Sequence, residues 1–258
     1  MNLIDSLLLG IVEGVTEFLP ISSTAHLIIS SKLLNIPQTE FQKFFEVFIQ
    51  SGAILAVVFM YFNFAIKNIE LMKKVMASFI PTAIIGFLLH KIIKNVFFES
   101  YGLIMGSLFV VGTLFILVEY LISRRKIRLT KSMKNLSFAD AIVVGLGQSL
   151  AVVPGVSRAG IVMLTMMIKG YNRKEAAVYS FLLAVPTILA AAALDLIKVD
   201  FKILLDPNNL LLVAVGFVTS FVTAYISVKW LINFLKKETL TGFGIYRILT
   251  SAILWFTR

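Results

Sequence analysis

Two glutamates stand close together inside an otherwise apolar stretch near the start of the chain. Glu13 and Glu17 are four residues apart in EGVTEFLPISSTAH, residues 13–26. Like charges with this spacing repel each other on a helix, so a cation, a shared proton or a basic side chain must compensate them. Carboxylate oxygens are the ligands that Mg²⁺ and Ca²⁺ prefer. We therefore expect Glu13 and Glu17 to hold a divalent metal, Mg or Ca.

Hydroxyl groups and a histidine follow these glutamates after Pro20. They are Ser22, Ser23, Thr24 and His26. A half-helix that begins here offers free backbone N–H groups to a phosphate, and the hydroxyls add donors. Taken alone, such residues more often cap a helix. Beside two carboxylates we expect Ser22 and Thr24 to bind substrate, and Ser23 or His26 to act as the nucleophile.

A second polar motif, PGVSRAG at residues 154–160, supplies positive charge. Gly155 allows a close approach of the backbone, Ser157 adds a hydroxyl, and the planar guanidinium of Arg158 fits phosphate oxygens in pairs. We predict that all three bind substrate and that Arg158 also takes part in catalysis. The structural alternative is an ion pair between Arg158 and Glu13 or Glu17. The two roles are compatible, since a resting pair can open to bind phosphate.

The composition is that of an integral membrane protein. Of the 258 residues, 59% are hydrophobic and 15% are charged. Soluble domains have about 45–50% apolar and about 25% charged residues. The net charge of +10 then reports topology and contact with anionic lipid, so we expect membrane lipids as partners and no nucleic acid. We expect residues 1–258 to form a single membrane domain.

Six stretches are long and apolar enough to cross a bilayer, which takes about 20 residues. They are residues 44–66, 75–94, 101–122, 176–197, 209–235 and 241–257. The two polar motifs interrupt two further apolar stretches, 5–34 at Pro20 and 138–168 at Pro154 and Gly155. We predict that each interrupted stretch forms two half-helices joined by a polar turn, which is a re-entrant hairpin.

The two interrupted stretches resemble each other. One begins DSLLLGIVEG and the other DAIVVGLGQS, with Gln148 in the place of Glu13, and both continue to Pro-x-x-Ser. Three predicted spans follow each copy, so the second half begins on the opposite face of the membrane. This order predicts an all-α, polytopic inverted-topology repeat with halves of about 1–123 and 137–258. Such repeats place the ligand site near the midplane, at the ends of broken helices.

The distribution of basic residues predicts the orientation. Loops near residues 67–74, 123–137, 169–174 and 236–237 carry twice as many Lys and Arg residues as the loops on the other side. The positive-inside rule makes this basic side cytoplasmic. Both termini and the entrance to the first hairpin then face outward.

Five other ionisable residues are not accompanied in the sequence by a comparable cluster of polar residues. We interpret them as interface or packing residues: Glu70, His90, Glu119, Glu175 and Asp195.

The motifs EGVTEFLPISSTAH and PGVSRAG resemble the two signature motifs of the undecaprenyl-pyrophosphate phosphatase family, the bacitracin-resistance type. The similarity runs nearly end to end and includes FEVFIQSGAILAVV (45–58), FLLAVPTILAA (181–191) and FGIYRI (243–248). The resemblance implies metal-dependent hydrolysis of undecaprenyl diphosphate to undecaprenyl phosphate and inorganic phosphate. It places this reaction at the outer face of the bacterial cytoplasmic membrane, where it recycles the lipid carrier of peptidoglycan synthesis and gives bacitracin resistance.

The resemblance also implies six spans with two re-entrant hairpins, often in a homodimer. The family's acids, serine, histidine and arginine match, in chain order, Glu13, Glu17, Ser23, His26 and Arg158. Two positions depart from the family pattern: Ala25 replaces a glycine and Ala159 replaces a second serine. The second change removes a hydroxyl that could bind phosphate.

Two hypotheses follow for the function. In the first, Ser23 or His26 attacks the terminal phosphorus, Glu17 acts as base or orienting group, Glu13 binds the metal, and Arg158 neutralises the diphosphate. In the second, the protein is a transporter or flippase, since inverted repeats with broken helices are typical of secondary transporters. The same residues would then bind a phosphorylated lipid or another anion without chemistry.

Overall fold

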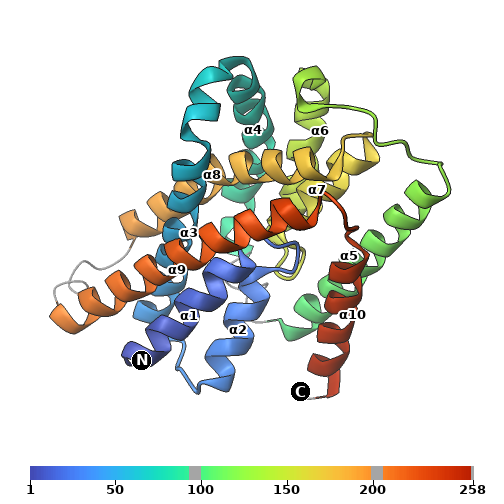
Figure 1. The fold of residues 1–258 in the computed structure, drawn as a ribbon. Coiled ribbons are helices and arrows are strands. Elements are labelled where there is room, and N and C mark those ends of the chain that lie inside the picture. Colours follow the sequence, from blue (N-terminus) through green and yellow to red (C-terminus); the bar gives the residue numbers. More distant parts are fainter. Residues whose placement is uncertain (93–99, 199–205, 257–258) are drawn as a thin grey trace.

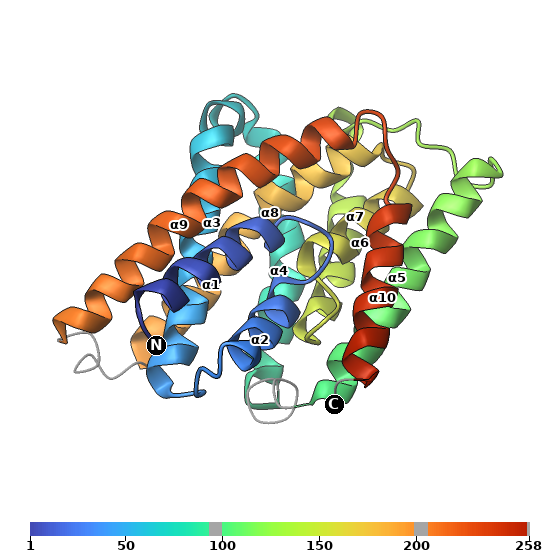
Figure 2. The same cartoon turned by 60° about the horizontal axis from the view of Figure 1, so that its bottom comes forward.

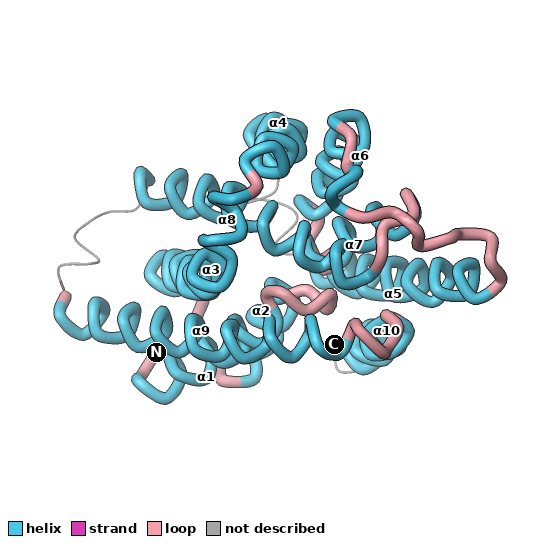
Figure 3. The backbone as a smooth tube through the Cα atoms, turned by 45° about the horizontal axis from the view of Figure 1, so that its top comes forward, coloured by secondary structure: helices cyan, strands magenta, loops and turns pink. Residues whose placement is uncertain are grey.

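The computed structural model describes residues 1–92, 100–198 and 206–256 (Figure 1). The helices are α1 Leu3–Thr16, α2 Ser23–Leu33, α3 Glu40–Lys67, α4 Ile69–Ile92, α5 Tyr101–Ser123, α6 Phe138–Ser149, α7 Arg158–Ile168, α8 Arg173–Lys198, α9 Pro207–Phe234 and α10 Thr241–Phe256. Several of these helices begin at a residue whose side chain caps the helix N-terminus. Asn2, Thr39, Ser137 and Asp206 each accept a hydrogen bond from a backbone N–H in the first turn of α1, α3, α6 and α9. Helices joined by loops make up the described chain (Figure 3).

Five of these helices are long and apolar enough to cross a membrane: α3, α4, α5, α8 and α9. Large apolar side chains lie on their outer surfaces, for example Phe59 at 71% and Phe87 at 72% exposure. Contiguous apolar surface of this kind suits lipid rather than water. The chain is therefore a multi-pass, all-helical membrane protein in its described ranges.

Five of the six predicted spans match helices that are long enough to cross a bilayer, and the sixth, 241–257, matches the shorter helix α10. Helix α10 has 16 residues, which is about 24 Å of helix, whereas the hydrocarbon core of a bilayer is about 30 Å thick. The ends of two predicted spans, residues 93–94 and residue 257, lie outside the described residues. The predicted stretch 241–257 is itself only 17 residues long, so α10 has close to the predicted length within the described residues.

Both interrupted stretches form two helices joined by a turn, as their proline and glycine residues predict. Residues 17–22 separate α1 from α2, and residues 150–157 separate α6 from α7. Ser22 and Ser157 stand immediately before α2 and α7 with φ angles of 76° and 72°. The sequence comparison had matched Ser23 with Ser157, but the backbone makes Ser22 the equivalent of Ser157. A left-handed φ is unfavourable for serine, so contacts around each turn must impose its shape.

The two interrupted stretches pack against the long helices in the same way. Helix α1 lies along α9, and α6 lies along α4 (Figure 2). In the first pair, the hydroxyl of Ser6 donates to the carbonyl of Leu212 at 2.6 Å. In the second pair, the hydroxyl of Ser78 donates to the carbonyl of Ala141, also at 2.6 Å. Each contact joins a helix of an interrupted stretch to a carbonyl or hydroxyl on its long neighbour.

Helices α5 and α10 run side by side (Figures 1 and 2). They cross at Gly112 and Gly244, where a Cβ atom added to either glycine would lie 2.8 Å from the backbone oxygen of the other. The helices therefore meet backbone to backbone, as small residues allow in membranes.

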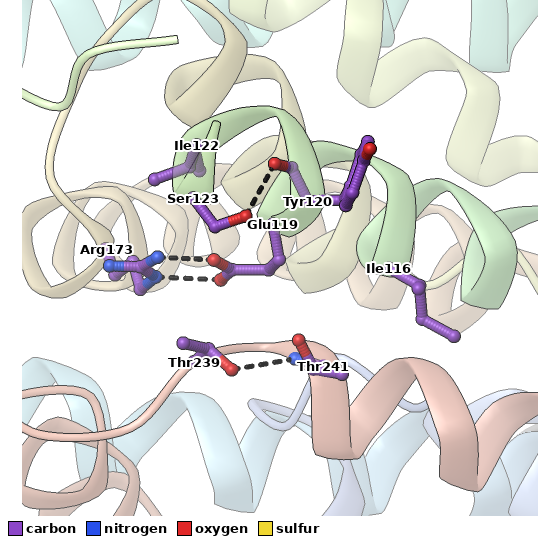
Figure 4. Close-up of a pocket in the computed structure, with 8 residues that line it drawn as sticks. All are labelled: Ile116, Glu119, Tyr120, Ile122, Ser123, Arg173, Thr239 and Thr241. Atoms are coloured by element: carbon purple, nitrogen blue, oxygen red, sulfur yellow. Dashed lines mark hydrogen bonds and ion pairs between the residues drawn. The ribbon is translucent and has the colours of Figure 1, made fainter. Parts of the chain in front are cut away.

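A buried ion pair closes one end of this helix pair. A cavity of about 300 Å³ is lined there by Ile116, Tyr120, Thr239 and Thr241 among others (Figure 4). Glu119 accepts hydrogen bonds from Arg173 Nε at 2.7 Å, from Arg173 Nη2, and from the backbone N–H of Leu240 at 2.9 Å. Glu119, predicted as an interface or packing residue, thus joins α5, α8 and the segment leading into α10.

The close contact between α1 and α9 gives a first prediction. A Cβ added at Gly14 would lie 2.0 Å from Thr223 Oγ1 and 2.4 Å from the backbone oxygen of Ser220. We expect Gly14→Ala to destabilise the protein by about 1–3 kcal/mol, because α1 must move away from α9. Thermal unfolding of the purified protein in detergent checks this. Gly106→Ala on α5, where a Cβ would meet nothing within 4 Å, is the control; equal midpoints for the two variants would contradict the prediction.

Candidate active site

Glu17 lies between a serine and an arginine where the two turns meet. Its Oε2 accepts a hydrogen bond from the hydroxyl of Ser23, and its Oε1 accepts one from Arg158 Nη2 at 2.5 Å. The Glu17 and Arg158 side chains are only 7% and 11% exposed. The sequence left open whether Arg158 would pair with Glu13 or with Glu17. In the structure Arg158 pairs with Glu17. A carboxylate hydrogen-bonded to a serine hydroxyl is placed to accept its proton.

Two further contacts orient Arg158. Its Nη1 donates to the backbone carbonyl of Ser180 at 3.1 Å, and the guanidinium lies 5.9 Å from the centre of the Phe18 ring. Phe18 in turn packs edge-on against Phe181, with ring centres 5.3 Å apart. These contacts from α8 and from the first turn hold the guanidinium plane in place. A bound anion would therefore meet donors that are already oriented.

Glu13 is completely buried, and neither of its carboxylate oxygens has a hydrogen-bond partner. Three charged side chains influence the Glu13 carboxylate electrostatically: those of Glu17, Arg158 and Glu46. Since two of these are also acids, a buried Glu13 needs a proton or a cation to compensate it.

The donor set therefore fits a divalent cation at Glu13 and Glu17, through hard oxygen ligands. Among the described residues, no group of three or more His, Asp and Glu side chains could hold a metal alone. Substrate or water oxygens would have to complete the coordination shell.

The ring of His26 is not hydrogen-bonded to Ser23, although their spacing allows a shared helical face. Its Nδ1 is bonded to the backbone carbonyl of Ser22 at 2.7 Å, and its Nε2 to the hydroxyl of Tyr246 at 2.7 Å. Because both ring nitrogens have other partners, the acceptor for the Ser23 hydroxyl is Glu17. The structure thus gives different hydrogen-bond partners to two residues that the sequence treats as alternative nucleophiles.

The other residues that the sequence predicts to bind substrate differ in their burial and contacts. Ser22 makes no side-chain capping bond to α2 and is buried, while Thr24 is partly buried on the first turn. Ser157 accepts a hydrogen bond from the N–H of Gly160 at 3.1 Å and so caps α7. Gly155 has φ 90°, and a Cβ there would lie 2.7 Å from the backbone oxygen of Ile104. The close approach that Gly155 permits is therefore to α5.

Arg247 on α10 was not predicted as a site residue. Its guanidinium is fully buried and donates to the carbonyls of Pro20 at 3.0 Å, Gly155 at 2.5 Å and Val156 at 3.1 Å. It thus joins the first turn to the second. Its signal in the sequence was a single arginine inside the apolar stretch 241–257.

Glu46 on α3 is a third acid that sequence reasoning missed. Its Oε1 accepts hydrogen bonds from the hydroxyl of Ser31 at 2.9 Å and from Gln42 Nε2 at 2.8 Å. Ser31 lies on α2, so Glu46 holds the second half-helix against α3. Glu46 lies within FEVFIQSGAILAVV, a segment that resembles the family, but the sequence alone predicted no role for this acid.

Known proteins resemble this chain over nearly its whole length. A family model described as "Bacitracin resistance protein BacA" matches residues 6–253. A curated relative from Aquifex aeolicus, named undecaprenyl-diphosphatase, is 46% identical over 249 residues and covers 96% of each chain. Proteins of the same name from Persephonella marina and a Sulfurihydrogenibium species are each 45% identical, and cover 98% and 99% of this chain and 98% and 100% of their own length.

Proposed function

Because the chain belongs to the family of bacitracin resistance protein BacA, we propose that its two turns form the active site of an undecaprenyl-diphosphatase. The protein hydrolyses undecaprenyl diphosphate to undecaprenyl phosphate and inorganic phosphate. The single observation that supports this site best is the buried Glu17, bonded to the hydroxyl of Ser23 on one side and to Arg158 on the other. This reaction recycles the carrier of peptidoglycan synthesis and accounts for bacitracin resistance.

In the proposed mechanism, Ser23 is the nucleophile. Its Oγ bonds to the terminal phosphorus as the bridging P–O bond breaks, its proton passes to Glu17 Oε2, and undecaprenyl phosphate leaves. Water then attacks the phosphorus of the new P–Oγ bond. Its O–H becomes part of the released phosphate, its other hydrogen returns to Ser23 Oγ as that bond breaks, and Glu17 gives up the proton from the first step to solvent. His26 is less well placed for the attack, since both of its ring nitrogens are hydrogen-bonded elsewhere.

Binding of the diphosphate requires the resting ion pair to rearrange. Arg158 would donate to phosphate oxygens with the Nη2 group that it now gives to Glu17. The hydroxyls of Ser22 and Thr24 and the first N–H groups of α2 add donors around the same phosphate.

Glu13 and Glu17 would hold the divalent metal, Mg or Ca, which supplies positive charge beside the diphosphate. We expect chelation to lower the rate by about 10²-fold or more. Glu13→Gln should raise the metal concentration needed for half the maximal rate by about tenfold, because it removes one charged ligand. Phosphate release from undecaprenyl diphosphate in detergent measures both effects.

The exposed Glu70, paired with Lys73 at 2.6 Å, provides the matched control, since Glu70→Gln should leave the metal dependence unchanged. Full activity in chelator would overturn the metal assignment. A folded protein that releases no phosphate at all would overturn the phosphatase itself. The next experiment would then be flipping of the lipid phosphate in liposomes, which tests the transport hypothesis.

The membrane topology proposed for this site is an inverted repeat of two five-helix halves, about residues 1–123 and 137–258. Each half would contribute one re-entrant hairpin and three spans, with α10 as the sixth and shortest. The matching pairs α1 with α9 and α6 with α4, and the left-handed serines before α2 and α7, support this repeat. A homodimer stays a prediction from the family resemblance.

The active site is proposed to open to the outer face, with both termini outside. The basic loops predict this orientation by the positive-inside rule. In Figures 1 and 2 the N-terminus and the last described turn of α10 lie toward the lower edge, while the turn between α3 and α4 lies at the upper edge. That turn is flanked by Lys67, Lys73 and Lys74, which lie in the first of the basic loops predicted to be cytoplasmic.

A further inference from the structure

The hydrogen bond between His26 and Tyr246 joins α2 to α10 beside the site. The two residues are 220 positions apart, and His26 Nε2 lies 2.7 Å from the Tyr246 hydroxyl. Their rings are nearly parallel, at 10°, with centres 5.7 Å apart. None of the roles given above to the two turns uses this tyrosine.

The partner of Nδ1 determines which atom donates in the hydrogen bond between His26 Nε2 and Tyr246. Nδ1 of His26 lies 2.7 Å from the carbonyl oxygen of Ser22, which can only accept a hydrogen bond. Nδ1 therefore carries hydrogen. In the neutral imidazole Nε2 is then unprotonated, and it accepts the hydrogen bond that the Tyr246 hydroxyl donates.

The tyrosine is held in place by its neighbour in the chain. Arg247 donates to the carbonyls of Pro20 and Gly155, so the turn of α10 that carries Tyr246 is fixed relative to both hairpin tips. Tyr246 itself is 44% exposed.

We propose that Tyr246 is a positioning residue for His26: by donating to Nε2, the Tyr246 hydroxyl holds the imidazole, and with it the start of α2, against α10. The effect on turnover rests on the proposed phosphatase function, whereas the hydrogen bond and the tautomer do not. In this tautomer Nε2 accepts hydrogen bonds. Because Nε2 has a single lone pair, which the Tyr246 hydroxyl occupies, the bond would act on turnover by holding the start of α2, which carries Ser23, in place.

The first test reads the tautomer directly. The chain has two histidines, so His90→Gln leaves His26 as the only imidazole. In this protein, labelled with ¹⁵N-histidine, the NMR shifts of the ring nitrogens should report a single Nδ1–H tautomer. Because the Ser22 carbonyl keeps hydrogen on Nδ1, adding Tyr246→Phe should retain this tautomer and shift the Nε2 resonance, since that nitrogen loses its hydrogen bond. Tyr120→Phe on α5, where the tyrosine is 52% exposed, is the matched control and should leave the spectrum unchanged.

The second test separates positioning from folding. Tyr246→Phe should lower kcat for phosphate release by about ten- to a hundredfold with little change in KM, and should leave the thermal midpoint near that of the parent. An unchanged His26 spectrum in Tyr246→Phe overturns the inference, whatever the activity. A shifted spectrum in a protein without phosphatase activity keeps the inference and overturns the proposed function instead.

Discussion

Replacing Glu17 by glutamine is expected to reduce phosphate release by about 10³-fold or more. The amide still occupies the space between Ser23 and Arg158, but it cannot take the proton of the Ser23 hydroxyl. Loss of a general base typically costs about 10²–10⁴ in rate. Loss of a metal ligand adds to this. Steady-state phosphate release at saturating metal measures the effect, with Glu40→Gln, an exposed acid paired to Lys43 at 3.1 Å, as control. A rate within tenfold of the parent would exclude Glu17 as the base.

The same variant should also be less stable, for a separate reason. It leaves the guanidinium of Arg158 buried without its charged partner, which typically costs about 3–5 kcal/mol. The double variant Glu17→Gln with Arg158→Gln removes both charges and should recover much of this stability while remaining inactive. Thermal unfolding of the single and double variants therefore separates the structural role of the ion pair from its catalytic role. No recovery in the double variant would mean that the pair is not coupled.

Replacing Arg247 by lysine is the second substitution with a large expected effect. One ammonium group cannot reach the carbonyls of Pro20, Gly155 and Val156 together, and each buried acceptor left unsatisfied costs about 1–3 kcal/mol. The two turns should then separate, with Glu17 on one side and Arg158 on the other. We expect a loss of about 10²-fold in activity, because misplacement of catalytic groups by about 1 Å is sufficient for that.

A matched control for Arg247 lies on the next turn of α10. The hydroxyl of Ser251 donates to the carbonyl of Met105 at 2.9 Å, so it joins α10 to α5 without touching either turn. Ser251→Ala should lower the thermal midpoint slightly and keep the activity. If Arg247→Lys is as active as Ser251→Ala, the arginine does not hold the turns together.

The breaks in the two interrupted stretches could be predicted because their causes are local. Pro20, Pro154 and Gly155 disfavour a continuous helix wherever the chain folds. The importance of Glu13, Glu17 and Arg158 could be inferred because an ionised side chain in an apolar stretch is costly anywhere. Which glutamate pairs with Arg158 depends on the three-dimensional meeting of two turns, and the sequence left that open.

The same reasoning about cost would have identified Arg247, which also stands alone in an apolar helix. It was counted within a membrane span, and its partners are backbone carbonyls that no sequence pattern displays. Tyr246 carries no such signal, since a tyrosine in a membrane helix is ordinary. The hydrogen bond between His26 and Tyr246 therefore lay beyond the sequence. The one-residue shift that pairs Ser22 with Ser157 was hidden for a similar reason, because backbone φ angles are not written in the motif.

The bonds from Arg247 to the first turn also constrain the order of events during biosynthesis. Arg247 and Pro20 are 227 residues apart, so at about 5–20 residues per second the ribosome adds the arginine roughly 11–45 s after the proline. Arg158 follows Glu17 by 141 residues and so arrives earlier, but still after a delay of roughly 7–28 s. Through this interval the first hairpin has its acids without their basic partners. The nascent chain must therefore keep Glu13 and Glu17 hydrated, at the membrane surface or in the insertion machinery, until the second hairpin and α10 emerge to complete the site.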